Sequence, residues 1–405
     1  MDYQNFFSSA VNRMKSSKIR ELMKYASMPN VVSFGGGKPD PENFPFNDVE
    51  DIINNWDAKK VEAAMQYGNT AGYLPLINKL KERMKVKKHI NTDNQDIIVT
   101  TGGQQGLYLI SKIFVDPNDV VIVEEPSFVG ATASFLSNGA KIVSVPLLKD
   151  GVDVDALESL IIKLKNEGEK IKFFYTIPTF QNPAGITLSQ EKRKKIYEIS
   201  KKYDLIILED DPYSDLYFEG TDNDYLPIKA IGNDAPIIYL GTFSKIFCPG
   251  FRLAWIVADK KIIEKAGLAK QSIDACSSSF GQVVAYDYLE LEFIDKYLIK
   301  MREVYKAKKE LMIKCIKQYF PQEVKCTNPT GGFFIYVDLP QNISSELLFK
   351  KTIEKEVAFV TGEPFHTIEE EKDRHLRMSF SSSSNEEIEK GIKIIGECLK
   401  EMLKS

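Results

Sequence analysis

The chain has 405 residues, of which 43% are hydrophobic and 27% are charged, and its formal net charge is −4. This length and composition suit a folded protein of two or three domains with a large apolar core. Proteins that live on nucleic acid usually carry a basic balance or a basic patch. The sequence has no such excess of positive charge, so we expect no nucleic-acid partner.

The sequence also bears on location and on metal chemistry. Its five cysteines are dispersed and form no CxxC pair, which is typical of reduced thiols in a cytosol. Residues 1–5 lack the pattern of a signal peptide, and no apolar run approaches the roughly 20 residues that span a bilayer. Three widely spaced histidines give little material for a metal site or a Ser-His-Asp triad. We expect a cytoplasmic protein without a metal and without a membrane partner.

The first predicted elements precede residue 40. Residues 6–25 carry Phe7, Val11 and Met14 at helical spacing, which predicts an amphipathic helix. Residues 31–34 then read as a short strand that runs into three consecutive glycines, which indicate a turn.

Short apolar runs rich in β-branched residues alternate with helical stretches between residues 95 and 260. Two of the helices are predicted over residues 106–114 and 190–203. Such alternation predicts a mostly parallel sheet, of a seven-stranded type, covered by helices on both faces. Ligands of such sheets bind beyond the carboxyl ends of the strands. The predicted strands are residues 97–99, 120–123, 141–143, 173–175, 205–208, 237–240 and 254–257.

Charged helices dominate after residue 280, the clearest over residues 290–319. Strands predicted over 332–337 and 377–380 complete a small α+β unit. We therefore expect an α/β protein with a large domain of residues 40–290 and a smaller domain made of residues 1–39 and 291–405.

Three motifs follow predicted strands in a fixed order: an NPAG run that begins at Asn182, a DDPY run that begins at Asp210, and Ser244-Lys245 followed seven residues later by Arg252. This order resembles that of the fold-type I aminotransferases, which depend on pyridoxal 5′-phosphate (PLP). The resemblance covers essentially the whole chain. The runs SxIR, FGGGKPD, QYGNTAGY, TTGGQQGL and RMSFS are most similar to the kynurenine/2-aminoadipate aminotransferase branch.

The resemblance implies catalytic roles for three residues. Lys245 binds the cofactor covalently, which requires an amine whose pKa is lowered by desolvation or by neighbouring cations. Asp210 keeps a proton on the pyridine nitrogen. Tyr213, together with Asn182, hydrogen-bonds the phenolic oxygen of the ring.

The resemblance also implies how the rest of the cofactor is held. Phe128 stacks on the ring, and a tyrosine reaches the phosphate from the partner of a homodimer, at the position of Tyr67. A helix N-terminus supplies donors for a phosphate. The phosphate contacts implied by the family come from the backbone of Gly103 and Gln104 and from the side chains of Thr242, Ser244 and Arg252.

Substrate binding should use an arginine, because a guanidinium pairs a carboxylate through two hydrogen bonds. The resemblance assigns this role to Arg377, with Gly37 and Asn182 beside the same carboxylate. Arg20, in the SxIR run, matches a position that meets the distal group of the substrate.

We therefore expect an aminotransferase that moves the amino group of an L-amino acid to a 2-oxo acid such as 2-oxoglutarate. The expected donors are broad and include aromatic amino acids and 2-aminoadipate. Two alternatives stay open. One is another PLP reaction on the same fold, a β-lyase, a decarboxylase or a racemase. The other is an effector-binding regulator, although the chain begins directly with the SxIR segment and leaves no room for an N-terminal DNA-binding domain.

Overall fold

The computed structural model describes residues 3–14, 28 and 30–404. The predicted helix over residues 6–25 is wrong in its first part. A 3-10 turn covers Gln4–Phe6, and helix α1 covers only Ser9–Asn12. The Ser8 side chain accepts a hydrogen bond from the Val11 amide and starts α1 there, because a serine satisfies an otherwise free amide of the first turn. The rest of that predicted helix lies outside the described residues.

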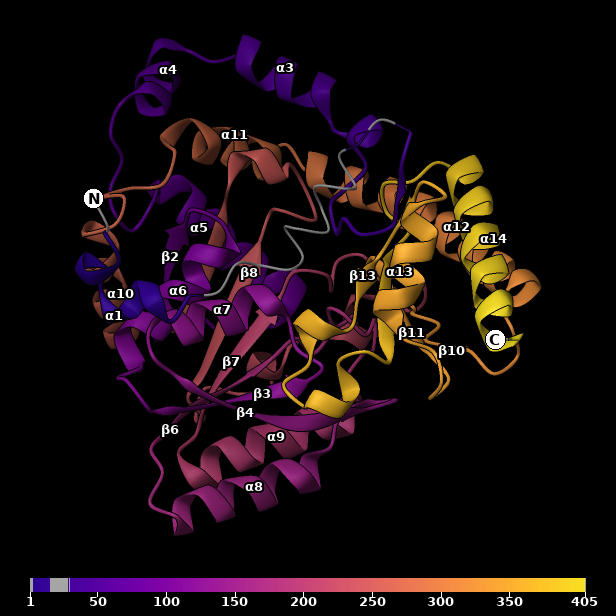
Figure 1. Cartoon of the computed structure of the whole chain (residues 1–405). Helices are drawn as coiled ribbons and strands as arrows, with labels where there is room; N and C mark the ends of the chain where they lie inside the picture. Colours follow the sequence, from indigo (N-terminus) through magenta and orange to yellow (C-terminus); the bar gives the residue numbers. More distant parts are fainter. Residues whose placement is uncertain (1–2, 15–27, 29, 405) are drawn as a thin grey trace.

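All seven strands predicted between residues 95 and 260 are present in one large sheet (Figure 1). An eighth, two-residue strand at its edge was not predicted. The order is β2-β9-β8-β7-β6-β3-β4-β5, and the run from β8 to β4 is parallel throughout. The bounds are β2 (Gln95–Thr100), β3 (Val120–Glu125), β4 (Lys141–Leu148), β5 (Gly151–Val152), β6 (Ile171–Thr176), β7 (Ile206–Asp211), β8 (Ile237–Thr242) and β9 (Ala254–Asp259).

Helices cover both faces of this sheet. Val121 and Val123 of β3 point into one apolar cluster, while the alternate residues Val120 and Ile122 point into another. Each such buried side chain contributes roughly 1.5–3 kcal/mol to folding. Figure 1 shows α8 and α9 together on one face and α5, α6 and α7 on the other. The helices are α3 (Phe46–Asn54), α4 (Ala58–Met65), α5 (Leu74–Lys88), α6 (Gly103–Phe114), α7 (Val129–Ser137), α8 (Val154–Asn166), α9 (Gln190–Tyr203), α10 (Lys260–Gln271) and α11 (Ser279–Glu290).

The C-terminal part forms a second, four-stranded antiparallel sheet in the order β10-β11-β14-β13. The helix predicted from residue 290 begins later, because Glu292 adopts a left-handed φ of 57° and separates α11 from α12. The elements are α12 (Phe293–Tyr319), β10 (Lys325–Cys326), β11 (Phe334–Asp338), α13 (Ser345–Ile353), β12 (Val357–Ala358), β13 (Val360–Thr361), β14 (His375–Ser379) and α14 (Asn385–Lys404).

The strand predicted over residues 31–34 is β1 (Val32–Ser33), which pairs in parallel with β12. The Phe34 carbonyl accepts a hydrogen bond from the Ser379 amide, so the chain before the triple glycine lies against β14. The Arg13 guanidinium, in contrast, bonds the Ser137 carbonyl at the end of α7. Across the described part of the chain, no helix combines the length and the apolar character needed to cross a membrane.

Candidate active site

Asp210 is buried near the carboxyl end of β7, as the sheet rule predicts. Its Oδ2 accepts a hydrogen bond of 2.8 Å from the hydroxyl of Tyr175 on the neighbouring strand β6. Burial, and next the negative charge of Asp211, raise the pKa of Asp210 to about 7, whereas the Lys245 charge opposes the shift. A carboxylate in this environment binds a proton or a cation strongly. A protonated nitrogen in the ring of a bound cofactor would offer this carboxylate both a proton and a positive charge.

Lys245 follows β8 and is half-buried. Its Nζ donates a hydrogen bond of 2.6 Å to the Gly37 carbonyl. Desolvation, together with the positive charges of Arg377 and Arg252, lowers the pKa of Lys245 to about 8. Roughly a tenth of the amine is then unprotonated at pH 7, against less than a thousandth for an ordinary lysine. The neighbouring cations that the sequence suggested are therefore in place.

Tyr213 and Asn182 lie between Asp210 and Arg377. The Tyr213 ring packs edge-on against Phe333 and Phe334, with centroids 5.6 and 5.8 Å away. Burial holds the pKa of the Tyr213 hydroxyl well above its usual range, so the group stays a hydrogen-bond donor, and it is bonded to Asn182. The two residues can therefore direct a donor and an amide at one ligand oxygen.

Arg377, on β14, is a buried cation. Its Nη1 bonds Asn182 Oδ1 at 2.8 Å and its Nη2 bonds the Gly35 carbonyl at 2.7 Å. The guanidinium lies 4.4 Å from the ring centroid of Phe334 and 5.0 Å from that of Phe365. Its Nε is buried and has no hydrogen-bond partner among the described residues. Burial lowers the pKa of Arg377 to about 10. Both features show a desolvated cation that a carboxylate ligand would stabilise.

A phosphate-sized anion fits the N-terminus of α6. The first amides of any helix lack partners within the helix, and here they belong to Gly103 and Gln104. Gly102 has a φ of +78°, and a Cβ added there would lie 2.3 Å from Arg252 Nη2, so Arg252 reaches this helix end. Around Gly103 a Cβ would meet nothing within 4 Å, which leaves the approach to the amides open.

Thr242 and Ser244 lie at the same place. Thr242 Oγ1 bonds Ser244 Oγ at 3.1 Å, and Arg252 Nη1 lies 3.4 Å from the same Ser244 Oγ. The structure thus brings together two hydroxyls, one guanidinium and a helix N-terminus. This donor set matches the charge and hydrogen-bonding capacity of a phosphate group.

For three further predicted residues, the described part of the chain shows no hydrogen bond to the site residues named above. Phe128 precedes the first turn of α7, and a Cβ added at Gly130 would lie within 2.7 Å of both Phe128 and Gln104, so Phe128 flanks the α6 terminus. Tyr67 is 89% exposed and no described hydrogen bond of its side chain joins it to the site. Arg20 lies outside the described residues.

Sequence reasoning missed several residues of the site. Tyr175 was counted only as part of an apolar strand, although its hydroxyl bonds Asp210. Gly35, whose carbonyl accepts from Arg377, stood in the triple-glycine run, which was a usable signal. The rings of Phe333 and Phe334 were read as strand residues, and their sequence position carries no sign that they face Lys245 and Arg377.

An amine of lowered pKa, a buried carboxylate and a donor set suited to a phosphate lie at the ends of strands of the large sheet, and the buried guanidinium of Arg377, from the antiparallel strand β14, lies close to the amine. The amine, the carboxylate and the phosphate-sized donor set fit the aldehyde, the ring nitrogen and the phosphate of PLP, and the arginine fits the carboxylate of an amino-acid substrate. The fold and the site together define the class of fold-type I PLP enzymes.

Comparison with known proteins narrows the class. A profile of class I and II aminotransferases matches residues 29–395. The aromatic-amino-acid aminotransferase 1 of Thermococcus litoralis is 41% identical over 404 residues, covering 100% of this chain and 96% of that protein. The 2-aminoadipate transaminase of Thermus thermophilus is 34% identical over 404 residues, with coverage of 100% and 98%. The crystal structure of Pyrococcus horikoshii kynurenine aminotransferase has a TM-score of 0.96 at 39% identity, covering 100% of this chain and 99% of that one.

The chain belongs to the class I and II aminotransferase family. It is a PLP-dependent enzyme that transfers amino groups, as the sequence predicted. The competing interpretations, a different PLP reaction or an effector-binding regulator, are not favoured by these relatives.

Proposed function

We propose that this aminotransferase takes its amino group from L-amino acids with aromatic or 2-aminoadipate-like side chains and passes it to a 2-oxo acid such as 2-oxoglutarate. The observation that carries the proposal is the buried guanidinium of Arg377, whose Nε has no partner among the described residues and can donate to a carboxylate. The aromatic rings of Phe333, Phe334 and Phe365 add apolar surface near the amine and the guanidinium. The names of the aromatic-amino-acid and 2-aminoadipate relatives support the same donors.

The reaction removes a proton from the substrate Cα, and PLP when bound supplies the electron sink for the resulting charge. Arg377 binds the substrate α-carboxylate, and Gly35 and Asn182 hold the guanidinium in place. Lys245 Nζ anchors the cofactor and, when free, accepts the Cα proton as general base, which its lowered pKa favours. Gly37 offers its carbonyl to that amine.

The remaining roles concern the cofactor ring and its phosphate. Asp210 holds a proton at the pyridine nitrogen, and Tyr175 fixes the carboxylate. Tyr213 and Asn182 donate to the phenolic oxygen. Phe128 stacks on the ring. The phosphate contacts come from Gly103, Gln104, Thr242, Ser244 and Arg252.

We extend the proposal to assembly and location. Tyr67 is exposed in the single chain, as are two apolar side chains close to it in sequence, Met65 at 76% and Leu74 at 62%. A second copy that covers them would bring Tyr67 to the partner's phosphate and form a homodimer. We also propose that the enzyme is cytoplasmic. We propose that its large domain comprises residues 40–290 and its small domain residues 1–39 with 291–405.

The test is the absorption spectrum of the purified holoenzyme before and after adding single amino acids. L-phenylalanine, L-kynurenine, L-2-aminoadipate and L-glutamate should each bleach the band of the lysine-bound cofactor and release the matching oxo acid. D-phenylalanine is the matched control, since it has the same side chain but the opposite Cα configuration, and it should leave the band unchanged. Activity with neither the aromatic nor the 2-aminoadipate donors would contradict the substrate proposal.

A further inference from the structure

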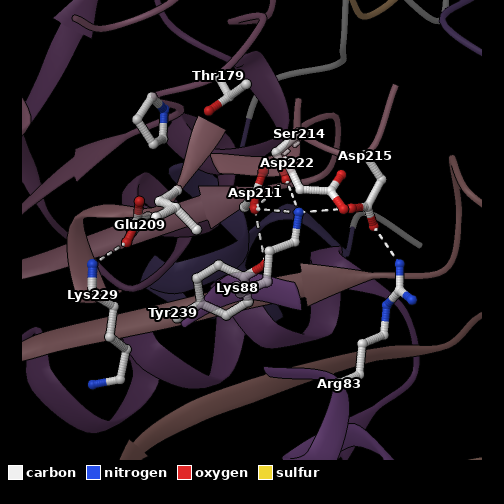
Figure 2. Close-up of polar contacts among 12 residues, drawn as sticks. Arg83, Lys88, Thr179, Glu209, Asp211, Ser214, Asp215, Asp222, Lys229 and Tyr239 are labelled. Carbon is white, nitrogen blue, oxygen red and sulfur yellow. Dashed lines mark hydrogen bonds and ion pairs between the residues drawn. The ribbon is translucent and has the colours of Figure 1, made fainter. Parts of the chain in front are cut away.

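A second group of buried charges lies around Asp211, the residue that follows Asp210 in β7 (Figure 2). Lys88, the last residue of α5, donates to Asp215 Oδ1 at 2.7 Å and to Ser214 Oγ at 2.5 Å. Its Nζ also lies 3.9 Å from Asp211 Oδ2. Arg83, one turn earlier on α5, pairs with Asp215 Oδ2 at 3.0 Å. All four charged side chains are buried.

This cluster is joined to the cofactor carboxylate by the alternation of a strand. Asp210 and Asp211 are consecutive in β7, so their side chains point to opposite faces of the sheet. Asp210 meets the Tyr175 hydroxyl of β6, while Asp211 accepts hydrogen bonds from Tyr239 of β8 at 2.9 Å and from Ser214 at 2.6 Å. Because the two carboxylates belong to consecutive residues, a change of charge at Asp211 acts on Asp210 through space at short range.

Little solvent screens these charges. The cavity beside them measures about 10 Å³, which is room for about one water molecule. Trp255 Nε1, which borders the cavity, is buried and has no described partner, so one water there would be well held. Interactions between charges are several times stronger in such a dry interior than in water.

The charges nearly cancel as the cluster stands. Lys88 and Arg83 supply two positive charges against the two carboxylates of Asp211 and Asp215, and the partly exposed Asp295 also pairs with Arg83, at 3.5 Å. Burial would raise the pKa of Asp215, but the charges of Lys88 and Arg83 hold it well below its usual range. The charge of Asp211, in turn, adds to the raised pKa of Asp210. Without Lys88 the cluster would carry one uncompensated negative charge.

We propose that Lys88 is a positioning residue of the transamination site, which acts by neutralising Asp211 and so keeps an excess of negative charge away from Asp210 and Lys245. The inference rests on the proposed roles of Asp210 and Lys245 and deepens them. The other titratable and charged groups near these residues are unchanged between the wild type and the variants used below. Around Asp210 and Lys245 they are Tyr175, Tyr213, Arg252 and Arg377. In the cluster of Lys88 they are Arg83, Asp215, Tyr239 and Asp295.

The test is a pH titration of the absorption band of the lysine-bound cofactor in the holoenzyme. Lys88→Met should move the midpoint to higher pH by on the order of one unit, because extra negative charge favours the protonated form of the linkage. Asp211→Asn should move it to lower pH. The double variant should return near the wild-type midpoint, and Lys88→Arg, which keeps the charge, should stay close to it.

Lys87→Met is the matched control. Lys87 precedes Lys88 on α5 and pairs with Asp295 at 3.5 Å from a partly exposed position, so the same substitution there should leave the midpoint unchanged. Opposite shifts in the two single variants support the inference, since a merely structural disturbance would not reverse sign with the charge. The inference is overturned if Lys88→Met and Asp211→Asn shift the midpoint in the same direction, or if neither variant shifts it.

The same experiment separates this inference from the proposed function. A wild-type protein without a lysine-bound cofactor band contradicts the roles of Lys245 and Asp210 themselves. A wild-type band that titrates normally, with variants that do not move it, overturns only the role of Lys88. If Lys88→Met does not fold, Asp211→Asn and Lys88→Arg still provide the charge-removing and charge-keeping arms.

Discussion

At the scale of single residues, burial moves the pKa values of the carboxyl group and the amine of the site towards neutral pH. Asp210 has a pKa raised to about 7 and Lys245 a pKa lowered to about 8, each chiefly by desolvation. Such displaced pKa values are typical of catalytic groups, because proton transfer is most efficient near the working pH. A bound ring nitrogen that carries a proton would keep Asp210 ionised, so the cofactor supplies the charge that the protein lacks.

Asp210→Asn should lower kcat by about 100-fold or more while leaving the fold intact. The amide keeps the shape and a hydrogen bond to Tyr175, but it cannot hold the ring proton by charge. Steady-state kinetics and a thermal melt of the apoenzyme would measure the two effects separately. An unchanged kcat would remove Asp210 from the chemistry.

Arg377→Lys should lower kcat/KM by about 100-fold, because a lysine cannot pair a carboxylate with two parallel hydrogen bonds. The effect should fall largely on KM for both the amino acid and the oxo acid, since both carry the same α-carboxylate. Arg374→Lys is the control, because this partly exposed arginine pairs with Glu371 at 3.7 Å, away from the site, and should retain wild-type kinetics. Equal kinetics in the two variants would exclude carboxylate binding by Arg377.

At the scale of elements, one polar junction joins the end of β3 to the segment before β14. Glu125, the last residue of β3, accepts a hydrogen bond from His366 Nδ1 at 2.6 Å and from the Thr367 amide at 3.1 Å. His366 Nε2 bonds the Tyr336 hydroxyl of β11 at 2.7 Å. The Phe365 carbonyl accepts from the Ser127 amide at 2.9 Å, next to Phe128. The junction therefore links the large sheet to the sheet that carries Arg377.

Glu125→Gln should reduce the free energy of unfolding by about 1–3 kcal/mol at pH 7. Burial would raise the pKa of Glu125, but hydrogen bonds from His366 and Thr367 lower it below its usual value. A lowered folded-state pKa means that the stabilisation is full above the unfolded value of about 4.3 and is lost as the pH falls through the lower folded-state pKa. Urea unfolding at pH 7 and at acidic pH should show the difference between variant and wild type shrinking on acidification.

Glu369→Gln is the control for that measurement. Its side chain is 81% exposed and pairs with nearby Lys372, so its loss should change stability by less than about 0.5 kcal/mol. A Glu125→Gln penalty that does not depend on pH would show that the junction stabilises by shape and not by charge.

At the scale of the whole molecule, the site draws on distant parts of the chain. Arg377 bonds Asn182, 195 residues earlier, and Lys245 bonds Gly37, 208 residues earlier. Tyr67 extends this dependence to a second copy if the proposed homodimer forms. Each active site would then contain Lys245 of one chain and Tyr67 of the other.

Mixing two impaired variants tests this arrangement. Lys245→Ala should be inactive, and Tyr67→Ala should bind PLP more weakly and turn over slowly. After the subunits exchange, half of the dimers are hybrids in which one of the two sites is intact, so activity should rise to about a quarter of the wild-type value. Activity that stays at the sum of the unmixed variants would show that Tyr67 serves its own chain's site or none.

Much of the architecture could be predicted from local patterns. The strands β2, β3, β6 and β8 could be recognised as continuous apolar runs, because a strand buried on both faces of a sheet does not alternate between apolar and polar residues. The helix predicted over residues 190–203 has these bounds in the structure, where Ser189 caps its first turn and Asp204, with a left-handed backbone, follows its last residue. The break at Glu292 and the short α1 escaped prediction, because neither carries a glycine or proline signal.

The sequence by itself determined the family, the cofactor and the motif residues, because the order of NPAG, DDPY and Ser244-Lys245 is a property of the chain alone. The tertiary structure decided which groups meet them. Lys88 precedes Asp215 by 127 residues, and only the tertiary packing of α5 brings its charge to Asp215 and Asp211. The free Nε of Arg377 and the Tyr175 bond to Asp210 depend in the same way on burial and on neighbouring strands. Desolvation and charge proximity act through space, so no local pattern of residues can report them.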